Sequence, residues 1–114
     1  MIYTSYFAKV PQLIERGIEP IAVSRGVPKN WRHRRALALA PSWAMLNMTD
    51  EEYDAEYDKI LERNDPHKFV EWLGDGDVAL LCWEKNPCDC HRLKIAAWLV
   101  KNGYQVQEFD PSVA

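Results

Sequence analysis

The residues best suited to chemistry in this chain lie close together. All three cysteines, Cys82, Cys88 and Cys90, fall in one short stretch, and His91 and Arg92 follow directly. A thiolate is a nucleophile and a metal ligand, an imidazole exchanges protons near neutral pH, and a guanidinium holds anions. The stretch therefore predicts reduced thiols that form a nucleophilic site or a metal site, rather than a disulfide framework.

The elements on either side of this stretch place it at a strand-to-helix junction. Val78 to Trp83 is an apolar run of strand length, typical of a strand buried on both faces. Behind the loop, apolar residues recur with helical spacing at Leu93, Ala96, Ala97 and Val100. Open α/β sheets bind ligands at such junctions, because the helix start offers unpaired N–H groups and favours negative charge.

The catalytic candidates are the three residues at the expected helix start. We expect Cys90 to be a nucleophile whose pKa is lowered by the helix and its neighbours, His91 to be an acid or base, and Arg92 to hold an anionic or nucleotide-like substrate. Cys82 and Lys85 are candidate substrate-binding residues of the same loop. The competing interpretation is that Cys82 and Cys88 are packing residues.

Zinc at Cys82, Cys88 and Cys90 is the alternative for these thiols. The spacing argues against it, because structural zinc sites typically use Cys-x2-Cys pairs, and neighbours such as Cys90 and His91 on a helix point about 100° apart. We therefore expect no resident metal or cofactor.

A second cluster of charge follows the second expected strand. Residues 25–35 hold no acid and five cations, namely Arg25, Lys29, Arg32, Arg34 and Arg35. They could contact nucleic acid, with Trp31 available for stacking, or form a solvated loop. Because parallel strands end at one edge of a sheet, we also expect Arg25 to bind substrate in one pocket with Arg92.

Composition sets the class of protein. The chain has 114 residues, a formal charge of −3 and 47% apolar residues, which predicts one domain over 1–114 with its own core. No apolar run approaches the roughly 20 residues of a membrane span, and the start lacks the pattern of a signal peptide. We expect a cytoplasmic protein that does not bind membranes.

Strands and helices are expected to alternate. The predicted strands are Met1 to Phe7, Glu19 to Ser24, Val78 to Trp83 and Tyr104 to Phe109. The predicted helices span about Pro11 to Arg16, 50–63, Pro66 to the stop at Gly74, and Cys88 to Lys101, with Thr49 and Asp65 as caps. The apolar stretch Ala36 to Leu46 could form either a helical turn or a packed loop. This order predicts a three-layer α/β domain with a small, mainly parallel sheet of about four strands.

The cysteine loop resembles a known signature. The stretch from Leu81 to Arg92, with Trp98-Leu99 and Gly103 to Val106 behind it and Ile2 to Thr4 at the start, is similar to the uncharacterised family numbered 488 among domains of unknown function. The second strand of that family usually ends in Asp-Val-Arg-x-x-Pro. The stretch from Val23 to Pro28 has the arginine and the proline of this pattern but lacks its acid. The resemblance implies a cytosolic α/β domain of bacteria or phages, without an established activity, whose matching polar residues are Arg25, Cys82, Cys90, His91 and Arg92.

Overall fold

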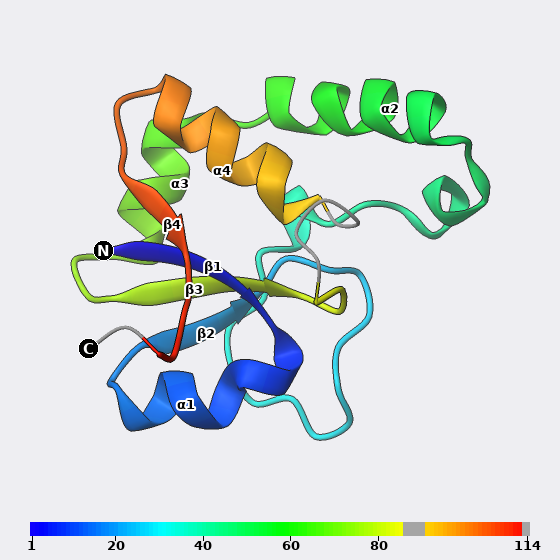
Figure 1. Ribbon diagram of the computed structural model, residues 1–114. Coiled ribbons are helices and arrows are strands. Elements are labelled where there is room, and N and C mark those ends of the chain that lie inside the picture. Colours follow the sequence, from blue (N-terminus) through cyan, green and yellow to red (C-terminus); the bar gives the residue numbers. More distant parts are fainter. Residues whose placement is uncertain (86–90, 113–114) are drawn as a thin grey trace.

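Four parallel strands form the centre of the protein. The computed structural model describes residues 1–85 and 91–112. Its strands are β1 (Ile2–Tyr6), β2 (Glu19–Ala22), β3 (Val78–Cys82) and β4 (Val106–Glu108). They pair in the order β2-β3-β1-β4, and each pair is parallel (Figure 1). The predicted small parallel sheet is confirmed.

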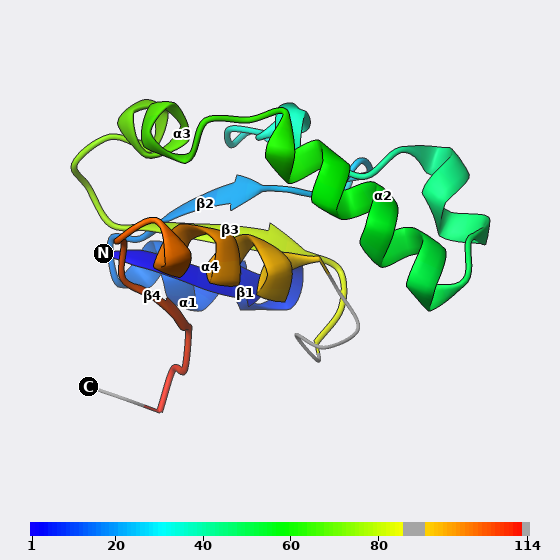
Figure 2. The same cartoon turned by 90° about the horizontal axis from the view of Figure 1, so that it is seen from above.

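Helices cover both faces of this sheet. Helix α1 (Val10–Glu15) lies on one face, and α2 (Asp50–Glu62), α3 (Pro66–Leu73) and α4 (Arg92–Lys101) lie on the other (Figures 1 and 2). The architecture is therefore the predicted three-layer α/β fold. Among the described residues, no helix has the length and apolar character needed to cross a membrane.

Strand β3 is buried on both faces because its side chains alternate between two hydrophobic clusters. Val78 and Leu80 pack in the cluster that includes Leu99 of α4, whereas Ala79 and Leu81 pack in the cluster that includes Leu13 of α1. All five residues of the strand are buried. An unbroken apolar run is therefore what this position requires.

The helix caps form as the sequence predicts. At the start of α2 the Thr49 hydroxyl accepts from the Glu52 amide at 3.2 Å, and the Glu52 carboxylate accepts from the Thr49 amide at 3.3 Å. Asp65 accepts from the His67 amide at 2.9 Å, directly before Pro66. Helix α3 ends at Gly74, whose φ of 91° lies in a region that suits glycine.

Some boundaries differ from the expectation. The last strand begins at Val106 rather than at Tyr104, because the Tyr104 amide donates to the Leu99 carbonyl at 3.1 Å and so completes the end of α4. Helix α4 begins at Arg92, and its expected first residues, 88–90, lie outside the described residues. The ambiguous stretch forms two 3-10 turns, Leu37–Leu39 and Trp43–Asn47.

A buried hydrogen bond holds the long connection between β2 and α2 against helix α2. The Tyr57 hydroxyl of α2 donates to the Leu39 carbonyl at 2.6 Å, and both residues are buried in the core. Burial raises the pKa of Tyr57 well above its usual value, so the hydroxyl stays protonated and donates.

Replacing Tyr57 by phenylalanine should lower the free energy of unfolding by about 1–2 kcal/mol, because the buried Leu39 carbonyl loses its donor. Urea denaturation followed by circular dichroism measures the change. The matched control is Tyr53→Phe on the same helix, whose hydroxyl makes no hydrogen bond with the described residues. Equal losses for both variants would contradict the role of this bond.

Candidate functional site

A pocket of about 420 Å³ opens beyond the carboxyl ends of β2 and β3. The two strands end side by side, with Ala22 paired to Leu81. Ligand sites of open α/β sheets occupy this edge. The described residues that line it are Ser24, Arg25, Gly26, Pro41, Ser42, Trp43, Leu46, Tyr53, Cys82, Trp83, Glu84 and His91. They come from both strand ends, the long connection, α2 and the start of α4.

The walls of the pocket are mainly apolar and aromatic. Trp43 and Trp83 line it while keeping 62% and 53% of their surface exposed, and Leu46 keeps 64%. The Trp83 indole N–H donates to the Gly26 carbonyl at 3.1 Å, which fixes that ring at the mouth. Exposed apolar groups of this size around one hollow are typical of a ligand site.

Arg25 supplies positive charge to the pocket. Its Nε donates to the Pro41 carbonyl at 3.1 Å, and its Nη2 lies 3.4 Å from the Ala40 carbonyl. These contacts aim the half-buried guanidinium without neutralising it, because it forms no ion pair with any described residue. The sequence prediction that Arg25 lies at the site is consistent with this position.

His91 forms part of the pocket floor. The ring is buried, and its Nε2 lies 2.6 Å from the Val23 carbonyl. A carbonyl only accepts, so Nε2 carries the proton in the neutral ring. Burial lowers the pKa of His91 to about 4, against a raising effect of the Val23 bond and with a smaller lowering effect of Arg92. The neutral ring thus links the start of α4 to the end of β2, and its acid or base role stays a prediction.

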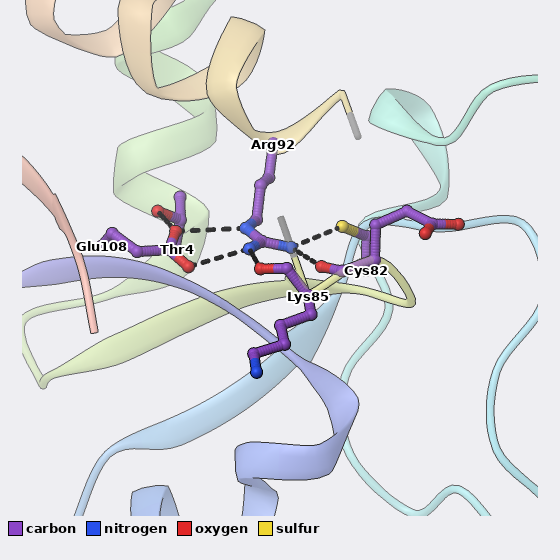
Figure 3. A network of polar contacts seen from close by, with 6 residues as sticks. Thr4, Cys82, Lys85, Arg92 and Glu108 are labelled. Carbon is purple, nitrogen blue, oxygen red and sulfur yellow. Dashed lines mark hydrogen bonds and ion pairs between the residues drawn. The ribbon is translucent and has the colours of Figure 1, made fainter. Parts of the chain in front are cut away.

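Arg92 is fully buried and does not line the pocket. Its guanidinium donates to both carboxylate oxygens of Glu108, at 3.1 and 2.8 Å, to the Lys85 carbonyl at 2.8 Å, and to the Glu84 carbonyl (Figure 3). It also lies 3.1 Å from Cys82 Sγ and 5.7 Å from the Tyr6 ring centre.

The expectation that Arg25 and Arg92 share one pocket is therefore wrong. Only Arg25 and His91 of the predicted arginine and histidine set line it, together with Cys82. Adjacent residues at a helix start point about 100° apart, so His91 reaches toward β2 while Arg92 reaches toward β1 and β4. A buried guanidinium needs a carboxylate and further acceptors, and Glu108 and the loop carbonyls satisfy it there.

The cysteines are only partly described. Cys82 is buried at the end of β3, lines the pocket and is disulfide-bonded, in contrast to the reduced thiols expected from the sequence. The predicted nucleophile Cys90 and the alternative zinc ligand Cys88 lie outside the described residues. Within residues 1–85 and 91–112, no three His, Cys, Asp or Glu side chains are grouped to hold a metal.

Two of the five cations of the basic segment serve the fold. Arg34 pairs with Glu19 through two contacts of 2.8 and 2.9 Å, which lower the pKa of Glu19, and its guanidinium stacks 4.5 Å from the Trp72 ring centre. Arg35 donates to the Arg25 carbonyl at 2.6 Å. Lys29 and Arg32 are exposed and have no ion pair in the described part of the chain.

Lys85 contributes its backbone rather than its amine. Its carbonyl accepts from Arg92, while its side chain is exposed and points away from that cluster (Figure 3). Its predicted contact with substrate remains a prediction.

Comparison with known proteins assigns the family. A family model described as "Domain of unknown function DUF488" matches residues 18–99, well over half of the chain. The chain belongs to DUF488. The search of curated proteins and the search of solved structures each found no match. The matched part of this DUF488 chain includes every described residue that lines the pocket, whereas the similar residues at 2–4 and 103–106 lie outside it.

Sequence reasoning missed several residues of the site and its support. Trp43 and Leu46 line the pocket but come from a stretch without a recognisable motif. Tyr53 also lines it, but it belongs to an apolar helix face of the kind that usually packs in a core. Glu108, the partner of Arg92, lies in a short strand far along the chain. An ion pair between distant segments leaves no local pattern, so no signal in one sequence could have found it.

Arg92→Lys should lower the free energy of unfolding by about 3 kcal/mol, because an ammonium cannot meet the Glu108 carboxylate and the loop carbonyls together. Chemical denaturation measures this loss. The control Arg32→Lys, at an exposed position, should change stability by less than about 0.5 kcal/mol. If Arg92→Lys were as stable as the control, the buried network would not hold the fold together.

The neutral His91 should make stability depend on pH. The ring takes up a proton near pH 6.5 in the unfolded chain but only near pH 4 in the folded one. The free energy of unfolding should therefore be highest above pH 6.5 and fall by about 3 kcal/mol as the pH is lowered from 6.5 to 4. His91→Gln keeps an N–H donor without titrating and should flatten this fall in denaturation curves across pH 4–8. The exposed His67→Gln should leave the fall unchanged; an unchanged fall in His91→Gln would contradict the assignment.

Proposed function

We propose that this DUF488 domain binds a small anionic or nucleotide-like molecule in the pocket at the ends of β2 and β3. The observation that carries the proposal is Arg25, a cation aimed into a mainly apolar pocket without a carboxylate partner among the described residues. A half-buried guanidinium without a carboxylate partner is able to form charge-assisted hydrogen bonds with a bound phosphate or carboxylate.

The shape and chemistry of the pocket support this proposal. Its volume of about 420 Å³ lies within the range of small-molecule sites, which are mostly apolar with a few polar groups that orient the ligand. Here Arg25, Ser24 and Glu84 are such groups. Burial raises the pKa of Tyr53 to about 12, so this wall residue also presents a neutral hydroxyl.

The reaction, if the domain is an enzyme, would depend on Cys90. The sequence makes this residue the nucleophile candidate, and its neighbour in the sequence, the neutral His91, lines the pocket. Arg92 supports the loop rather than the substrate in this proposal, because its donors already meet protein acceptors.

Nucleic-acid binding through the basic segment is the alternative function. It has less support, because Arg34 is committed to Glu19 and Arg35 to a backbone carbonyl. Arg25 faces the pocket, which leaves Lys29 and Arg32 as the exposed cations of the segment that have neither a hydrogen bond nor an ion pair with the described residues. Two exposed cations give only a weak electrostatic contribution.

Arg25→Gln should weaken binding of inorganic phosphate and of nucleoside monophosphates by about 10- to 100-fold in isothermal titration calorimetry, because a charge-assisted contact is lost. The matched control is Arg32→Gln, which removes a cation of the same segment outside the pocket. It should bind these ligands as the parent chain does.

Two results would overturn the proposal. The first is equal weakening in Arg25→Gln and Arg32→Gln. The second is tight binding of an oligonucleotide that Lys29→Gln and Arg32→Gln abolish, without binding of any small anion, which would favour the nucleic-acid function instead.

A further inference from the structure

We infer that the ligand carries a flat heterocyclic ring, as a nucleotide does, and that this ring lies against Trp43 and Trp83 at the mouth of the pocket. The inference rests on the proposed function and adds the class of ligand. It starts from the position of the two indoles rather than from the charge of Arg25.

The two tryptophans meet over Gly26. A methyl group placed on this glycine would lie 3.3 Å from Trp43 Cη2 and 3.9 Å from Trp83 Nε1. Both rings thus approach Gly26 from different segments, and a side chain on this residue would press against the Trp43 ring. Gly26 does not need a positive φ, so this close approach is what distinguishes it from the glycines at helix ends.

One of the rings is held firmly. Trp83 donates to the Gly26 carbonyl and packs at 4.7 Å against Phe7, so its orientation is set by the core. Trp43 is 62% exposed and makes no hydrogen bond through its indole with the described residues. A fixed ring with a more exposed ring nearby is an arrangement suited to taking up a planar group by stacking.

The polar groups fit a heterocycle better than a hydrocarbon ring. Arg25 offers donors for an anion, while Glu84 brings an acceptor carboxylate to the same pocket and forms no ion pair with the described residues. A nucleotide has both complements, because its phosphate accepts and its base or sugar carries N–H or O–H donors. A simple anion would leave the indoles and Glu84 without partners.

An alkyl chain is the competing occupant of the apolar wall. Pro41 and Leu46 would accept an alkyl chain as readily as a ring. Stacking separates the two ligands, since a base against an aromatic side chain contributes about 1–3 kcal/mol, or roughly 5- to 150-fold in affinity. Trp43 is the residue at which to test this, because it is exposed and its replacement leaves the core intact.

The experiment compares three kinds of ligand on the full chain by calorimetry, namely the four common nucleoside monophosphates, hexyl phosphate and inorganic phosphate. At least one nucleotide should bind more tightly than hexyl phosphate. Trp43→Leu should weaken that nucleotide by about 5- to 100-fold and leave inorganic phosphate unchanged, and Trp43→Phe should restore most of the affinity. The control Trp72→Leu changes an exposed tryptophan outside this pocket and should have no effect.

The outcomes separate this inference from the proposed function. If hexyl phosphate binds as tightly as every nucleotide, or if Trp43→Leu weakens both equally, the ring is not recognised and the inference is wrong, while Arg25-dependent anion binding stands. If no phosphate ligand binds, or if binding does not depend on Arg25, the proposed function fails, and the inference that rests on it fails too.

Discussion

The buried guanidinium of Arg92 holds together the end of the domain at which the pocket opens. It lies at the start of α4 and contacts Glu108 of β4, the carbonyls of Glu84 and Lys85, and Cys82 at the end of β3. Thr4 of β1 extends the network through a hydroxyl bond of 2.7 Å to Glu108 (Figure 3). A buried charge demands such partners, so three strands, one loop and one helix must take fixed positions around it.

His91, the residue next to Arg92, connects the start of α4 to the β2 side of the sheet. His91 points away from Arg92 and reaches the Val23 carbonyl just past β2, while its ring lies 5.0 Å from that of Tyr57. Two consecutive residues therefore join α4 to both halves of the sheet. The pocket opens on the His91 side, because the Arg92 side is filled by its own ion pair.

Arg25 differs from the arginines whose contacts stabilise the fold. Arg34 and Arg92 have carboxylate partners, and Arg35 supports the Arg25 backbone. Arg25 is itself aimed by carbonyls, which orient its charge but do not neutralise it. Whether an arginine of this basic segment stabilises the fold thus depends on its partners and not on its place in the segment.

Local patterns in the sequence determined the alternation of strands and helices and the caps at Thr49 and Asp65. These features depend on residues close together in the chain, so hydrophobic periodicity and capping chemistry suffice to find them. Tertiary structure alone decided that Arg92 pairs with Glu108, that His91 is neutral, and that Trp43 joins Trp83 at the pocket. Each of these depends on burial or on contacts between distant segments, and neither burial nor distant contact is recorded in local sequence.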